Sequence, residues 1–60
     1  MNKYLFITYY RDNIAKCYRL FRITKDGDEI LEKESFNEFV VPKYIKEHKI
    51  KKITTKNIYL

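Results

Sequence analysis

The sequence predicts a small α+β domain, an antiparallel β-meander followed by one helical segment and a C-terminal strand, in the order β-β-β-α-β. Three observations predict this fold class. Two segments rich in β-branched and aromatic residues flank an Asp-Asn dipeptide, the only glycine provides a second turn, and the only proline lies in the one segment with helical signals. With 60 residues, we expect a single domain over residues 1–60.

The first two strands are predicted to form a hairpin. Residues 3–10 and 15–24 carry the side-chain types that suit a pleated surface. Between them, Asp12 and Asn13 tolerate the left-handed backbone that a two-residue hairpin turn requires. We therefore expect strands 3–10 and 15–24 to pair in antiparallel fashion around these two residues.

A third, shorter strand is predicted at residues 29–34. It follows the strongest turn of the chain, residues 25–28, where Gly27 is free to adopt a positive φ. The strand is rich in glutamate, and charge on an edge strand discourages unwanted pairing. We expect it to form an edge of an antiparallel sheet.

The helical segment begins near Ser35, which together with Glu38 has the spacing of a capping box. Pro42 complicates it, because proline inside a helix removes a hydrogen bond and clashes with the preceding turn. Either residues 36–40 form one turn and a new helix starts at Pro42, or one kinked helix spans residues 36–48. We favour the break, with residues 42–48 as the regular piece. Residues 53–59 then read as the last strand.

The hairpin has two half-apolar faces, and a single helix can cover only one of them. With Asp12-Asn13 as the turn, Tyr10 lies opposite Ala15 and side chains alternate with a period of two. The expected core face holds Tyr4, Phe6, Thr8, Tyr10, Ala15, Cys17, Arg19, Phe21 and Ile23, covered by Phe36, Phe39, Val40, Tyr44 and Ile45. The face left uncovered is our candidate protein interface, with Leu5, Ile7, Tyr9, Tyr18 and Leu20.

The net charge of +5 is divided along the chain. Residues 1–25 have six Lys or Arg and one acid, residues 26–41 have six acids and one Lys, and residues 42–60 have six Lys and one Glu. Because the acidic middle can neutralise part of the basic ends, the charge favours nucleic acid only weakly. A stacking and phosphate-binding surface is the alternative. Its residues are Lys3, Tyr9, Lys16, Tyr18, Arg22, Lys51 and Lys52.

Catalysis is not expected, because the groups that perform it are scarce. Cys17 and His48 are the only soft metal ligands, whereas a structural zinc site needs four. A lone cysteine is typical of a reducing compartment, so we expect a cytoplasmic protein. The apolar stretch 4–10 is too short to span a membrane. We expect no enzyme activity, cofactor, metal, membrane or small-molecule substrate.

The expected function is therefore a small, non-catalytic protein-interaction module. We expect a homodimer, a complex with a larger protein, or both. Size and a composition rich in Lys, Ile, Asn and Tyr suggest an AT-rich genome and a phage or mobile-element regulator or inhibitor of that larger protein. The alternative function is a small basic nucleic-acid-binding protein.

Overall fold

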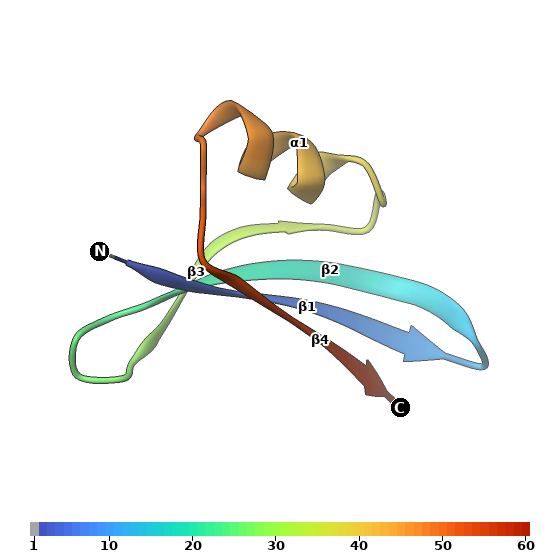
Figure 1. Cartoon of the computed structure of the whole chain (residues 1–60). Helices are drawn as coiled ribbons and strands as arrows, with labels where there is room; N and C mark the ends of the chain where they lie inside the picture. Colours follow the sequence, from blue (N-terminus) through green and yellow to red (C-terminus); the bar gives the residue numbers. More distant parts are fainter. Residues whose placement is uncertain (1) are drawn as a thin grey trace.

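The computed structural model describes residues 2–60 and confirms the predicted α+β fold and element order (Figure 1). Four strands form one sheet in the spatial order β3-β2-β1-β4, and the single helix lies over one side of it. The elements are β1 (Lys3–Arg11), β2 (Ile14–Ile23), β3 (Glu29–Ser35), α1 (Val40–Glu47) and β4 (Ile53–Tyr59).

Strands β1, β2 and β3 form the predicted antiparallel meander, but β4 pairs with β1 in parallel. This differs from the fully antiparallel sheet that we expected. Strands β3 and β4 both run in the direction of β1, so β3-α1-β4 is a crossover in which the helix carries the chain back across the sheet. The amide of Tyr4 donates to the carbonyl of Lys52 (3.1 Å), which joins the start of β1 to the residue just before β4.

The β1–β2 hairpin turns at Asp12 and Asn13, as predicted, and both residues have a positive φ (53° and 66°). Beyond the turn, however, the register shifts between Tyr9 and Tyr10, which pair with Cys17 and Ala15. Lys16 is therefore an extra residue in β2, a β-bulge. From Cys17 onward, every β2 residue is displaced by one relative to the predicted pairing.

This bulge overturns the predicted face assignment for β2. Phe6 lies opposite Leu20 rather than Arg19, and Thr8 lies opposite Tyr18 rather than Cys17. Because a shift of one residue exchanges the two faces of a strand, the β2 residues predicted for the core from Cys17 onward face away from it, whereas Ala15 still lies opposite Tyr10 as predicted. The β1 residues are placed as predicted. Turned towards α1 are Tyr18, Leu20 and Arg22, and turned away are Cys17, Arg19, Phe21 and Ile23.

A second bulge, in β3, connects the sheet to the helix. Leu20 pairs with Lys33 and Phe21 with Leu31, which leaves Glu32 as the extra residue. One Glu32 carboxylate oxygen accepts from Arg22 Nε (2.8 Å), and the other accepts from the Tyr44 hydroxyl (3.3 Å). Glu32 thus joins β2, β3 and α1, and it identifies which side of the sheet the helix occupies.

The predicted capping box does not form. The helix also matches neither predicted form, because residues 36–39 are turns and the helix starts before Pro42 rather than at it. It begins at Val40, so Pro42 occupies the third helical position, where an amide has no partner within the helix. The Ser35 hydroxyl accepts from the Asn37 amide (3.0 Å) and not from that of Glu38, and the Asn37 side chain accepts from the Phe39 amide (2.8 Å). These local turns replace the expected cap.

The core between α1 and the sheet is narrow. Leu20 and Val41 are both 0% exposed, and Thr8 is also buried. Phe36 and Phe39, which we expected to pack on the sheet, are 74% and 71% exposed, because they lie in the turns before the helix starts. Val41, rather than these aromatic residues, is the buried residue of the helix.

The Tyr44 phenol gives the helix contact a pH dependence. Its pKa is raised above 10.0 by desolvation, then by the Glu32 charge and the hydrogen bond to Glu32. The unfolded chain therefore ionises this phenol first, so its contribution to stability is complete below pH 10 and is lost as the pH rises through the folded-state pKa. We expect Tyr44→Phe to show a smaller alkaline loss of stability than the wild type in urea titrations followed by circular dichroism. An identical alkaline loss in both proteins would contradict this assignment.

A candidate protein-binding face

The sheet side that faces away from α1, here called the open face, has no chain segment over it in Figure 1. The helix contacts β2 and β3 from the other side, through Tyr44, Glu32 and Lys33. By register, the open face holds Lys3, Leu5, Ile7, Tyr9, Cys17, Arg19, Phe21, Ile23, Glu29, Leu31, Glu34, Thr54, Lys56 and Ile58.

The centre of the open face is apolar. Ile7 and Cys17 are each 6% exposed, although no helix covers them. The neighbours of Ile7 in the adjacent strands are Arg19 and Lys56, whose aliphatic stems can cover apolar surface. Further from the centre, Leu31 is 49% exposed. An apolar sheet face of this kind normally packs against another layer.

A polar cluster borders this apolar centre. The Arg19 Nε lies 2.5 Å from a Glu34 carboxylate oxygen, and its guanidinium carbon lies 4.9 Å from the centre of the Tyr9 ring. The pKa of Arg19 is raised, first by its hydrogen bond to Glu34 and then by one to Tyr9. The Arg19 guanidinium thus lies between the Glu34 carboxylate and the Tyr9 ring on the open face.

The predicted interface residues are divided by the β2 bulge. Leu5, Ile7 and Tyr9 lie on the open face, whereas Tyr18 and the fully buried Leu20 face the helix. Sequence reasoning missed Phe21, Leu31 and Ile58 as open-face residues. The alternation of Leu31 within β3 and Ile58 within β4 was available as a signal, but placing Phe21 required knowledge of the bulge.

The residues of the nucleic-acid alternative do not form one surface. Lys3 and Tyr9 lie on the open face, but Tyr18 and Arg22 face the helix, where Arg22 pairs with Glu32. Lys16 is the bulge residue, and Lys51 and Lys52 lie in the connection between α1 and β4. A single platform on the sheet that combines stacking rings with these basic residues is therefore not assembled.

Cys17 and His48 lie on opposite sides of the sheet. Cys17 is a buried free thiol on the open face. The His48 ring stacks on Tyr44 at 4.0 Å, and its Nδ1 lies 3.0 Å from the Tyr44 carbonyl oxygen, at the end of α1. Within residues 2–60, no three His, Cys, Asp or Glu side chains gather where they could hold a metal ion.

Comparison with known proteins yields no family model, no curated relative and no solved structure that matches this chain. Among the residues that the structure describes, α1 is too short to cross a membrane.

Proposed function

We propose that the chain is a non-catalytic protein-interaction module that forms a homodimer through its open face. The observation that carries this proposal is a sheet face with no chain element over it, on which the apolar side chains of Leu5, Phe21, Leu31 and Ile58 stay at least partly exposed around the buried Ile7. In the described chain, few apolar side chains are buried, and small domains commonly gain stability by association. The free thiol of Cys17 suits a reducing compartment, and we place the dimer in the cytoplasm.

The charges around the open face favour a second copy as the partner. Lys56, Ile7, Arg19 and Glu34 form one row across all four strands, with the basic end on β4 and the acidic end on β3. A two-fold axis parallel to the strands would place β4 of one copy over β3 of the other. Lys56 of each copy would then lie opposite the Arg19–Glu34 ion pair of the partner, with Glu34 directly across from it, so the basic edge of one copy meets the acidic edge of the other.

The dimer would use a modest share of the molecular surface. A stable interface buries about 800 Å² on each partner. The exposed surface of the described chain is 4808 Å², so such an interface would cover roughly one sixth of it. Sheets that pack face to face lie about 10 Å apart, which allows the apolar side chains of the two open faces to interdigitate.

Substitution of two neighbouring residues of β3 tests the proposal. Leu31 (49% exposed) faces the open side, and Ile30 (41% exposed) pairs with Arg22 on the helix side. We expect wild type and Ile30→Lys to sediment as dimers, near twice 7.4 kDa, and Leu31→Lys to sediment as a folded monomer because an unpaired ammonium would be desolvated in the interface. Sedimentation equilibrium measures the mass, and circular dichroism checks the fold.

The result has two outcomes that would overturn the proposal. A wild-type chain that stays monomeric at high protein concentration would exclude the homodimer. Equal dissociation by Ile30→Lys and Leu31→Lys would place the interface elsewhere, since only Leu31 lies on the open face.

A further inference from the structure

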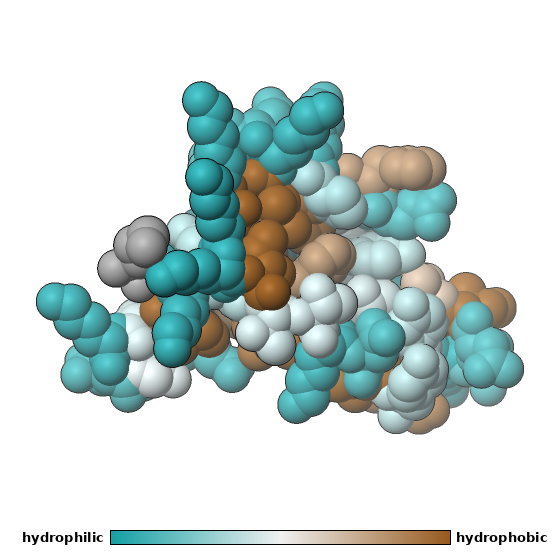
Figure 2. Space-filling model, viewed as in Figure 1, coloured by the Kyte–Doolittle hydropathy of each residue, from teal (hydrophilic) through white to brown (hydrophobic). Residues whose placement is uncertain are grey.

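The parallel pairing of β4 gathers three basic segments at one end of the sheet. β1 starts there with Lys3, β2 ends there before Lys25, and the connection from α1 reaches the same end just before β4. That connection carries Lys49, Lys51 and Lys52. In Figure 2, strongly hydrophilic side chains line the edge of the molecule where α1 descends to β4 in Figure 1. We call this set of five lysines the lysine end.

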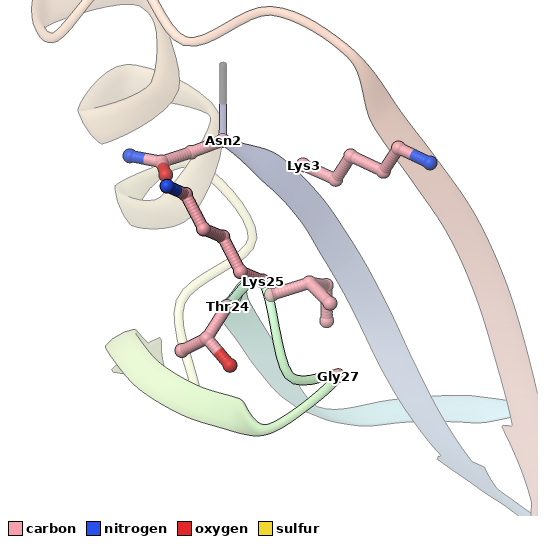
Figure 3. A pocket seen from close by; sticks show the side chains of 6 residues that line it. Asn2, Lys3, Thr24, Lys25 and Gly27 are labelled. Atoms are coloured by element: carbon pink, nitrogen blue, oxygen red, sulfur yellow. The ribbon is translucent and has the colours of Figure 1, made fainter.

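Two depressions lie side by side at the lysine end, and Asn2 lines both. The smaller, of about 240 Å³, lies between the start of β1 and the connection after α1. The larger, of about 410 Å³, lies between the start of β1 and the β2–β3 turn, and Figure 3 shows the Lys25 side chain reaching towards Asn2. Lys3 extends in a different direction in that view, so these two lysines point to different sides of the larger depression. The smaller is lined by Asn2, Tyr4, His48, Lys49, Ile50, Lys51 and Lys52.

The linings of the two depressions are cationic. All five lysines contribute to one lining or the other, and neither lining includes an Asp or Glu. The ion pairs within residues 2–60 are Arg19–Glu34 and Arg22–Glu32, so these ammonium groups are not neutralised by a close carboxylate. Asp26 and Asp28 lie in the β2–β3 turn beside the larger depression and border the site on its β3 side.

We propose that the lysine end binds successive phosphates of a nucleic-acid strand. Lysine ammonium groups act as point charges that bind phosphate without a fixed geometry. Two adjacent depressions with cationic walls suit a chain of separate charged groups, which a nucleic-acid backbone provides. Binding of this kind does not depend on base sequence, and it weakens as salt increases.

This site shares Lys3 and Ile23 with the border of the open face, and its other lining residues lie outside that face. Lys49, Lys51 and Lys52, which the test below changes, lie in the α1–β4 connection and not on the open face. Of the nucleic-acid set predicted from the sequence, only Lys3, Lys51 and Lys52 belong to the lysine end. The fold places two further lysines, Lys25 and Lys49, in the linings of the same two depressions.

Binding of a fluorescein-labelled single-stranded oligothymidylate, followed by anisotropy over a salt series, tests the proposal. For a single strand, each phosphate neutralised contributes about 0.7 to the slope of log affinity against log salt. We expect the triple variant Lys49→Gln/Lys51→Gln/Lys52→Gln to bind more weakly and to lose about 2 units of that slope. All three residues are exposed, so circular dichroism should show an unchanged fold.

The matched control removes the same charge elsewhere. Arg11→Gln/Lys16→Gln/Lys43→Gln changes three exposed basic residues on the hairpin and the helix, away from both depressions. We expect this variant to keep most of the slope. Equal losses in both variants would overturn the site in favour of net charge alone. Absent oligonucleotide binding would also overturn it, whether or not vesicles containing phosphatidylserine bind the same lysines. The sedimentation result for Leu31→Lys is read separately, so one proposal can fail without the other.

Discussion

Leu20→Ala should leave most of the protein unfolded at room temperature. Leu20 is 0% exposed and is one of only two fully buried large side chains in the described chain, together with Val41. Truncating a buried leucine to alanine costs about 2–5 kcal/mol. A single core in a domain of this size rarely supplies more than about 3–5 kcal/mol, so the loss is comparable to the total free energy of unfolding. Far-ultraviolet circular dichroism and urea titration measure it.

Leu60→Ala is the control for this prediction. Leu60 is 69% exposed, and its backbone amide donates a hydrogen bond to the Tyr10 carbonyl, which alanine retains. We expect it to change the free energy of unfolding by less than about 0.5 kcal/mol. If Leu20→Ala were equally mild, Leu20 would lie on the open face, as the uncorrected hairpin register implied.

Deletion of single residues from β2 should show that the bulge residue can be removed, whereas a residue of the regular ladder cannot. Removal of Lys16 leaves Tyr10 opposite Ala15 and Tyr9 opposite Cys17, which is the pairing of a regular hairpin. We expect this deletion to be tolerated, with a change of about 1 kcal/mol or less. Removal of Arg19 should unfold the protein, because every residue on one side of the gap would move to the opposite face, and Leu20 would leave the core.

The two deletions remove residues of similar chemistry from the same strand. Arg19 also pairs with Glu34, but its side chain is 40% exposed, so loss of this ion pair and of its packing alone would be a modest effect. Thermal unfolding followed by circular dichroism compares them. Unfolding by the Lys16 deletion, or a cooperative native transition after the Arg19 deletion, would contradict the observed register.

The sequence predicted the elements of the fold well, because local signals determine them. Asp12 and Asn13 specify a left-handed turn, and Pro42 restricts where the helix can run. The sequence did not predict the register between β1 and β2 or the direction in which β4 pairs with β1. A bulge such as that at Lys16 leaves no mark in the alternation of a strand whose two faces are equally apolar. Whether β4 runs parallel or antiparallel to β1 is also not encoded in residues 53–59, because it depends on the path of the helix.

Only part of the candidate site could be predicted, because local alternation assigns the faces of β1 but does not reveal the bulge in β2. The β1 residues Leu5, Ile7 and Tyr9 were assigned correctly, since their alternation is unaffected by the bulge. The exposure of Phe36 and Phe39 was missed because their spacing from Ser35 resembled a helix start. In the structure, the Ser35 and Asn37 side chains instead accept hydrogen bonds from backbone amides two residues further on, which closes turns rather than starting a helix. Short polar side chains next to the backbone permit both outcomes.

The crossover to β4 has a kinetic consequence. The β1–β2–β3 meander closes through short turns, whereas β4 joins β1 from the opposite end of the chain and must wait for the helix to be placed. Contacts between distant segments form late and open early, so β4 is the strand whose amide hydrogens should exchange with solvent first. Its detachment would disperse Lys49, Lys51 and Lys52 from Lys3 and Lys25. We therefore expect the lysine end to be complete only in molecules in which β4 has docked on β1.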